Sequence, residues 1–278
     1  MNYLLLNSDE FLDYARPATN RVVYIGGIAL PKLSPLSEEL QKIMDQNDKE
    51  GVVYISFGSV VPTKHMPPHI RDAIVTTARK HPMYSFIWKI DDDDVVENVA
   101  NLYTFTWVPQ RSILAHRNLR CFVSHAGLNS VLELAISGKP SILIPIFADQ
   151  FRNARMTEAK NTTILIAKEE LNSDTLSLAL YRVLSDDSFA YRAERLASLM
   201  KNKPFSIRER LLSTVEFSIQ HGKIDNLDTR GRKLNAIQYY SIDSALFLSA
   251  VVFLTILGAV KLFMSSFYTI FTMKTKKE

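Results

Sequence analysis

Short apolar runs alternate with longer amphipathic stretches through the middle of the chain. The runs lack a regular polar alternation, which is typical of strands buried on both faces of a parallel sheet. The pattern predicts strands at 52–57, 84–90, 103–106, 121–124, 141–146 and 164–167. The stretches between them carry apolar residues at helical spacing, and they predict helices at 70–81, 110–115, 129–137, 153–160, 172–184 and 187–200. This alternation predicts an α/β fold with a Rossmann-like, doubly wound parallel sheet.

Further segments flank this core on both sides. Residues 1–31 contain a strand at Leu4–Leu6 and an extended stretch that ends in two glycines, and a linker with a helix capped by Ser37 follows. Another amphipathic helix is expected at 206–220. The organisation we expect is 1–31 as the end of a preceding domain plus linker, 32–222 as the core domain, 223–241 as a juxtamembrane segment, 242–268 as a transmembrane helix and 269–278 as a basic tail.

The segment 242–268 differs from every other helix of the chain. Residues 245–260 carry no charge and only Lys261 interrupts the apolar run, which is long enough to cross a hydrocarbon core of about 30 Å. The tail after it contains Lys274, Lys276 and Lys277, and the positive-inside rule then favours a cytosolic C-terminus. The spacing of the tail lysines is also that of an endoplasmic reticulum retrieval signal. We therefore expect a single-pass type I protein of the endoplasmic reticulum membrane, whose core and Asn161-Thr-Thr163 sequon are lumenal.

Composition and charge exclude several classes of function. The 278 residues carry a formal net charge of +4 without a basic stripe interleaved with aromatics, which argues against nucleic-acid binding. The single cysteine, Cys121, falls in a predicted buried strand and is expected to be a core residue. His65 and His69 have a metal-binding spacing, but two prolines between them break the helix such a pair needs. The acidic run 91–94 is more typical of a solvated loop, so we expect no metal.

The stretch around 121–137 predicts an anion site. A strand, a glycine turn and a helix follow one another, so His125, Gly127, Asn129 and Ser130 fall at a helix N-terminus, which favours phosphate. Ser59, in the Gly-Ser turn after the first core strand, is a second phosphate candidate. A plain turn is the more common role for such a pair. Lys89, at the end of the next strand, either neutralises phosphate or is solvated.

Other side chains in the same region fit the rest of a nucleotide. Glu133 lies one turn into the helix and is placed to accept hydrogen bonds from a ribose, and Trp107 offers a flat face for a base. Asp149 and Gln150 follow the next strand and are candidates for sugar hydroxyls. Each of these residues taken alone is more typical of a core or solvated position. The G-x-G-x-x-G spacing of dinucleotide-binding turns is absent, which disfavours an NAD-dependent dehydrogenase.

Taken together these positions resemble a known family. The order W-x-P-Q, F-V-S-H-A-G-x-N-S-x-x-E, G-x-P and P-x-F-x-D-Q, which runs from Trp107 to Gln150, resembles the signature of UDP-glycosyltransferases, and most closely the animal UDP-glucuronosyltransferase branch. The resemblance implies that uracil lies against Trp107, Val108 and Gln110, and that His125, Gly127, Asn129 and Ser130 hold the diphosphate, with Ser59 beside them. It further implies that Glu133 binds the ribose and that Asp149 and Gln150 contact the donor sugar. Ala126 departs from the pattern, because many animal members have glycine there, and its methyl is expected beside the phosphates.

The resemblance also implies a reaction and an architecture. The fold would be the donor half of a two-domain, GT-B type glycosyltransferase that moves glucuronic acid or a hexose from a UDP-sugar to a small lipophilic acceptor. The UDP-sugar is a co-substrate and no cofactor is implied. The catalytic base of the family belongs to the N-terminal domain, so no catalytic residue is expected in this chain, which by itself would be inactive. The alternative is a non-catalytic, membrane-tethered UDP-sugar-binding fragment that regulates or pairs with full-length members, in which case an oligomer with those members is expected.

Overall fold

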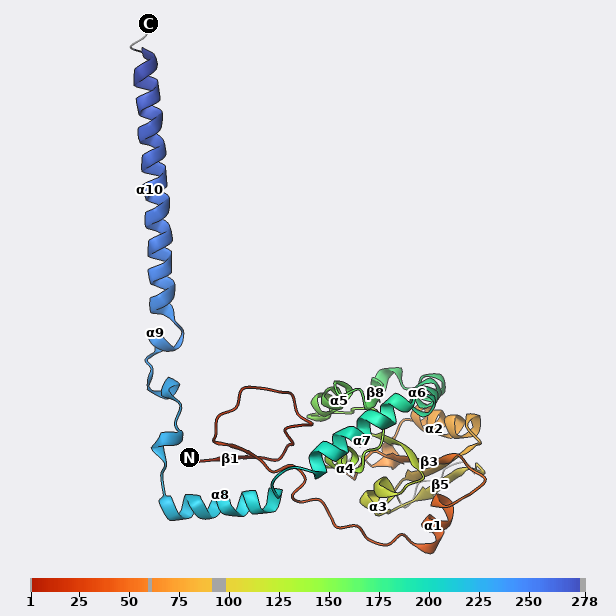
Figure 1. Cartoon of the computed structure of the whole chain (residues 1–278). Helices are drawn as coiled ribbons and strands as arrows, with labels where there is room; N and C mark the ends of the chain where they lie inside the picture. Colours follow the sequence, from red (N-terminus) through yellow and green to blue (C-terminus); the bar gives the residue numbers. More distant parts are fainter. Residues whose placement is uncertain (1, 60–61, 92–98, 276–278) are drawn as a thin grey trace. The chain divides into compact units, whose positions relative to one another are not determined.

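The structure is a computed structural model that describes residues 2–59, 62–91 and 99–275 (Figure 1). It separates into two compact units, one made of residues 3–222 and the other beginning at Lys223. Asp92 to Asp94 of the acidic run and Lys276 and Lys277 of the tail lie outside the described residues. Each unit is described by itself below.

The first unit is built on a parallel sheet with strand order β5-β4-β3-β6-β7-β8. This arrangement confirms the predicted α/β fold with a doubly wound sheet. The chain builds one half of the sheet outward from β3 and then returns to start the other half at β6, beside β3, so a topological switch point lies between these two strands. The strands are β3 (Gly51–Ser56), β4 (Tyr84–Lys89), β5 (Leu102–Phe105), β6 (Leu119–Ser124), β7 (Ser141–Leu143) and β8 (Thr163–Leu165).

Helices cover both faces of this sheet, as the apolar runs predict. Val53 and Ile55 of β3 face one apolar cluster, while Val52 and Tyr54 face another, so the strand is buried on both sides. The first cluster is closed by α2 (Pro68–Lys80) and α6 (Ser173–Ser185), and the second by α1 (Glu38–Met44), α3 (Gln110–Ala115) and α4 (Leu128–Ser137). A third cluster joins α4 to α5 (Gln150–Glu158) and α7 (Asp187–Lys201). Short 3-10 turns lie at Thr63–His65 and Lys168–Glu170.

The N-terminal segment is attached to this core by buried charges. Its two strands, β1 (Leu4–Leu6) and β2 (Val22–Tyr24), pair in parallel. Lys203, with a side chain only 4% exposed, lies 2.6 Å from carboxylate oxygens of both Asp9 and Glu10. Helix α8 (Ile207–His221) follows and buries none of its residues.

Two boundaries differ from the sequence-based expectation in a way that matters for the site. Strand β7 ends at Leu143, three residues before the predicted end, and α5 begins at Gln150, three residues before the predicted start. Proline at position 145 lacks the N–H that a ladder needs, and the chain turns there. Asp149 and Gln150 therefore lie at the first turn of a helix and not in a loop that follows a longer strand.

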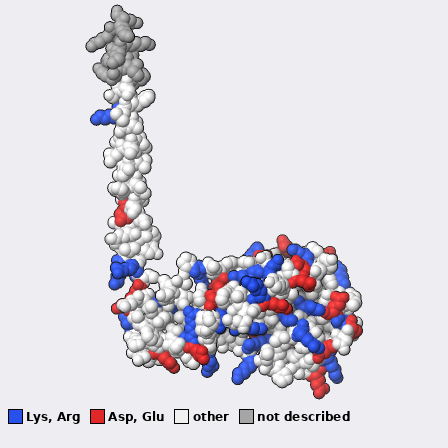
Figure 2. All heavy atoms as spheres, in the orientation of Figure 1, with Lys and Arg blue, Asp and Glu red and all other residues white. Residues whose placement is uncertain are grey.

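The second unit contains the long apolar helix. Turns at Asp225–Leu227 and Arg230–Lys233 and the short helix α9 (Ala236–Tyr239) precede α10 (Ile242–Thr275), which extends beyond the predicted end at 268. Residues Ile242–Ser266 have a mean hydropathy of 2.3 and are long enough to cross a membrane. Figure 2 shows that the part of this helix not drawn in grey is almost entirely white and so carries few charged side chains. Its length and composition suggest membrane anchoring.

Candidate functional site

The candidate site lies at the carboxyl ends of the sheet strands, on both sides of the switch point. Ser59 follows β3, Lys89 ends β4, Trp107 follows β5 and His125 follows β6. Carboxyl ends of parallel strands meet at one edge, and ligands of open α/β sheets bind at this edge. The fold thus brings chain segments that are distant in sequence to the same place.

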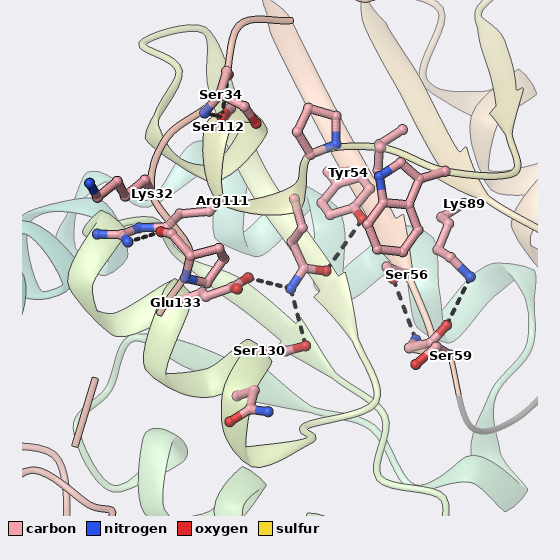
Figure 3. Close-up of a pocket in the computed structure, with 17 residues that line it drawn as sticks. Lys32, Ser34, Tyr54, Ser56, Ser59, Lys89, Arg111, Ser112, Ser130 and Glu133 are labelled. Carbon is pink, nitrogen blue, oxygen red and sulfur yellow. Dashed lines mark hydrogen bonds between the residues drawn. The ribbon is translucent and has the colours of Figure 1, made fainter. Parts of the chain in front are cut away.

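A cavity of about 430 Å³ opens at this edge (Figure 3). Its wall combines strand ends, the start of α3, the first turns of α4 and the linker at 31–34. Most of the sequence-predicted site residues line it: Ser59, Trp107, Val108, Gln110, Asn129, Ser130 and Glu133. His125, Gly127, Asp149 and Gln150 are not part of the cavity wall, and their places are given below.

Gln110 is the hydrogen-bonding centre of the cavity. Its amide nitrogen donates to Glu133 Oε2 at 2.6 Å and to Ser130 Oγ at 3.2 Å, and its amide oxygen accepts from the Tyr54 hydroxyl at 3.3 Å. These bonds are among the dashed lines in Figure 3. They join side chains from β3, α3 and α4 within the chain itself, so this part of the cavity is held in place by its own residues.

Glu133 is a buried carboxylate whose pKa is raised above its ordinary value. The residue is 9% exposed. Burial raises the pKa of its carboxyl group, while the hydrogen bond from Gln110 and the charge of Arg111 oppose that rise. When ionised, the carboxylate accepts hydrogen bonds only, which matches the paired hydroxyls of a ribose.

Trp107 presents an aromatic ring to solvent. It is 75% exposed, whereas Trp88, the other tryptophan of the chain, is completely buried in the core. Val108, which follows it, is buried and anchors the segment. A large exposed ring in the cavity wall is suited to stacking against a planar ligand.

His125 is enclosed by two glycines. A Cβ atom placed on Gly58 would lie 2.7 Å from the imidazole ring, and one on Gly127 would lie 2.6 Å from it. The residue is 9% exposed, and burial lowers its pKa, although a hydrogen bond with the Ser56 backbone and the charge of Asp149 act in the opposite direction. A lowered pKa keeps the ring neutral at neutral pH, with one N–H to donate.

The N-terminus of α4 lies directly after this histidine. Gly127 is the N-cap and supplies no side-chain cap, so the first N–H groups of the helix have no side-chain acceptor there. Asn129 and Ser130, in the first turn, face the cavity. The N-terminus of this ten-residue helix is therefore suited to binding an anion, as the sequence predicts.

Asp149 and Gln150 lie at the start of α5, where their polar atoms are engaged in the local turn. The amide oxygen of Gln150 accepts from the backbone N–H of Ile146 at 2.8 Å and of Phe147 at 3.1 Å. Asp149 is exposed and accepts from Asn153 at 2.8 Å. Their contact with a donor sugar stays a prediction.

Several residues of the cavity were missed or left open by the sequence. Tyr54 and Ser56 lie within β3, where burial on both faces hides which side chains reach the edge. Lys89, for which solvation was the competing expectation, lines the cavity and donates to the Gly58 carbonyl at 3.1 Å. The linker contributes a wall, because Ser34 and Ser112 exchange two hydrogen bonds of 3.0 and 2.7 Å and Arg111 donates to the Pro31 carbonyl. The linker's position on α3 could not be inferred from any local signal either.

Ala126 occupies a different environment from the one expected. Its backbone has a φ of 65°, a conformation that favours glycine, yet the residue is completely buried within the apolar cluster that contains Leu12, Val131 and Leu143. The expectation that its methyl lies beside the phosphates is therefore wrong in this structure. The methyl contributes to the core behind the turn.

Comparison with known proteins finds similar sequences over most of the chain. The sequence profile described as UDP-glucoronosyl and UDP-glucosyl transferase matches residues 1–277. The protein ugt-50 of Caenorhabditis elegans is 32% identical over 95% of this chain and 51% of its own length. Human UDP-glucuronosyltransferase 1A3 is 32% identical over 89% of this chain and 46% of its own, and rat 2-hydroxyacylsphingosine 1-beta-galactosyltransferase is 30% identical over 98% and 49%.

A solved structure supports the fold. The glycotransferase of kitacinnamycin superposes with a TM-score of 0.63 at 22% identity, covering 77% of this chain and 55% of that one. The chain spans about half the length of the curated relatives it matches, and it corresponds to the C-terminal, donor-binding half of a GT-B enzyme. Since the family profile covers nearly every residue, the chain belongs to the family of UDP-glucoronosyl and UDP-glucosyl transferases.

Proposed function

We propose that this chain is the donor-binding half of a UDP-glycosyltransferase that moves glucuronic acid or a hexose from a UDP-sugar to a small lipophilic acceptor. The named relatives include glucuronosyl- and galactosyltransferases, and enzymes of this kind use the UDP-sugar as a co-substrate. The observation that carries the proposal is the set of groups gathered at one cavity. An exposed aromatic ring, a buried carboxylate and the first turn of a helix without a side-chain cap all line it, which fits base, ribose and diphosphate.

The donor is proposed to bind in this order along the cavity. Uracil stacks on Trp107 beside Val108 and Gln110, and the ribose hydroxyls donate to Glu133. The diphosphate is held by Ser59, by the backbone and side chains at the start of α4, and by the neutral ring of His125. The sugar extends toward Asp149 and Gln150. In this arrangement each polar part of the donor meets a group of complementary hydrogen-bonding character.

The chemistry we propose is an inverting displacement. The acceptor oxygen bonds to the anomeric carbon, the bond from that carbon to the phosphate oxygen breaks, and UDP leaves with the electron pair. The acceptor proton passes to a base supplied by the acceptor-binding domain of the complete enzyme. The donor half contributes by stabilising the negative charge that develops on UDP, through the helix N-terminus and the His125 N–H.

We also propose where this reaction takes place. Helix α10 spans the endoplasmic reticulum membrane once, with the first unit lumenal and the C-terminus cytosolic. The length and hydropathy of the helix support anchoring. The spacing of the tail lysines, which is that of an endoplasmic reticulum retrieval signal, supports a cytosolic C-terminus. Limited proteolysis of sealed microsomes tests the orientation, because only the tail should be cleaved and Asn161 should be open to glycosylation. Digestion of the whole first unit would contradict it.

Binding and transfer are tested on the detergent-solubilised 278-residue chain. Calorimetry should show saturable binding of UDP and of a UDP-sugar, and no comparable binding of NAD, because the sequence lacks the G-x-G-x-x-G spacing of dinucleotide-binding turns. Assays with a phenolic acceptor should show no transfer until the acceptor domain of a relative is supplied. Failure to bind UDP would overturn the proposal, and robust transfer by the chain alone would overturn the division of labour between the two halves.

A further inference from the structure

The segment before the long helix carries a cluster of exposed basic side chains. Lys223, Arg230, Arg232 and Lys233 all precede α10 and are all exposed. Figure 2 shows blue side chains grouped where the white helix begins. Two of the four are paired locally, Lys223 with Asp225 at 2.7 Å and Arg232 with Asp228 at 2.9 Å. Within the part of the chain that the structure describes, Arg230 and Lys233 have no ion-pair partner, so the cluster keeps an excess of positive charge.

Apolar side chains of the same segment are exposed as well. Leu234, Ile237, Tyr239 and Tyr240 are between 46% and 72% exposed. The two tyrosine rings pack edge to face with centroids 5.1 Å apart. Basic side chains beside exposed tyrosines and aliphatic groups are the composition of segments that lie in a membrane interface, where the apolar parts enter the acyl boundary and the charges meet headgroups.

This segment is tied to the beginning of α10. The Asn235 capping box starts α9, and the Ser241 N–H donates to the Gln238 carbonyl at 3.2 Å. The Ser241 carbonyl in turn accepts from Ala245, inside α10, at 3.0 Å. Only residues 234–241 separate Lys233 from the helix, and four of them are helical, so the separation is at most about 25 Å. If α10 spans a bilayer, the basic cluster cannot leave the neighbourhood of its surface.

We propose that residues 230–240 bind the headgroups of anionic phospholipids at the surface where α10 enters the bilayer. Arg230 and Lys233 contact the lipid phosphates, and the exposed tyrosine and aliphatic side chains lie in the interface. Anionic lipids are favoured over zwitterionic ones because only they offer net charge to the unpaired cations. The proposal rests on the membrane-spanning role of α10. The proposed lipid binding does not depend on which side of the membrane the segment faces.

The test uses the full chain reconstituted into phosphatidylcholine vesicles with spin-labelled phosphatidylserine or phosphatidylcholine. Electron paramagnetic resonance measures how much of each label is immobilised by the protein, and their ratio gives the lipid selectivity. The wild type should prefer phosphatidylserine. Each basic side chain near the surface is worth at most about a fivefold preference, so R230Q/K233Q should lower the ratio several-fold. Raising the salt to about 0.5 M should lower it similarly.

Matched variants separate this surface from other basic residues. K201Q/R208Q removes two exposed cations of the first unit and should leave the selectivity unchanged. R230K keeps the charge and should retain the wild-type ratio. Equal selectivity in R230Q/K233Q and the wild type would overturn the proposal, as would loss of all selectivity in K274Q/K276Q alone, which would assign the lipid to the tail.

Two further measurements make the outcome decisive. Alkaline extraction before the lipid measurement shows whether the chain is embedded, and release of the chain would overturn the anchor and with it this proposal. UDP calorimetry on R230Q/K233Q should match the wild type, so a change in lipid selectivity with intact UDP binding belongs to the segment 230–240. The lipid measurement can therefore contradict this proposal while UDP binding stays intact, and the reverse also holds.

Discussion

The two ends of the cavity are built in different ways. At the end proposed for the nucleoside, Gln110 connects Tyr54, Ser130 and Glu133 through side-chain hydrogen bonds. At the end proposed for the phosphates, a helix N-terminus without a side-chain cap provides backbone N–H groups. His125, which is not itself part of the wall, lies close to Gly58, which is. The first end should therefore be sensitive to changes of charge, and the second to added atoms. The comparison predicts that different substitutions should affect nucleoside and phosphate binding separately.

The largest effect is expected for Gly58→Ala. The new Cβ would lie 2.7 Å from the His125 ring, and the backbone φ of +84° is one that side chains rarely adopt. Overpacking and the backbone conformation together should destabilise the native arrangement of Gly58 and His125 by about 2–4 kcal/mol. Calorimetry should show UDP affinity reduced at least about tenfold, while uridine, which has no phosphate, should bind within about twofold of the wild type.

The control for this variant is Gly231→Ala. Its added Cβ would have no neighbour within 4 Å, so both ligands should bind as in the wild type. Equal losses of uridine and UDP in Gly58→Ala would mean that the two ends are not separable. Thermal melts of both variants show whether a loss of binding reflects unfolding.

Glu133→Gln should affect the opposite end of the cavity. The substitution keeps the size of the side chain but removes the charge that accepts from the ribose, at a cost of about 1–3 kcal/mol. Titrations should show UDP and uridine weakened by the same factor. Glu39→Gln, an exposed carboxylate of α1, serves as the control. Unchanged UDP affinity in Glu133→Gln would mean that Glu133 does not bind the ribose.

The pH dependence of uridine binding sharpens the same point. Burial raises the pKa of Glu133, and hydrogen bonds from a ribose would lower it again in the complex, because they favour the ionised form. Uridine affinity should therefore have its full value above the pKa of Glu133 in the free protein, which lies above 4.5. It should fall as the pH drops through that pKa. The loss should not exceed that of Glu133→Gln, and in that variant the dependence should vanish. A dependence that persists in the variant would assign the titration to another group.

The two ends also differ in how far the sequence alone predicts them. The phosphate end follows one continuous stretch, so strand, turn and helix N-terminus could be inferred from the spacing of His125, Gly127 and Ser130. The nucleoside end depends on contacts between segments distant in sequence, such as Tyr54 with Gln110 and the linker with α3. Strands buried on both faces give no periodic signal for which side chains reach an edge, so Tyr54 and Ser56 were not predicted. The direction of the Ala126 methyl was inferred wrongly, because the sequence does not show that this residue takes a left-handed backbone conformation with its methyl in the core.

The smallest effect is expected for Ala126→Gly. Glycine would relieve the strain of a φ of 65°, worth about 1–2 kcal/mol, but would lose a buried methyl and gain freedom in the unfolded chain, each worth about 0.5–1 kcal/mol. The opposing effects should leave the melting temperature nearly unchanged. Because the methyl packs in the cluster with Leu12 and Leu143 and not against the cavity, UDP affinity should stay within about twofold of the wild type. Calorimetry of UDP and uridine on the same variant tests this directly. A change of more than about tenfold in UDP affinity alone would place the methyl beside the phosphates after all, and would make the turn at Ala126 a determinant of donor binding.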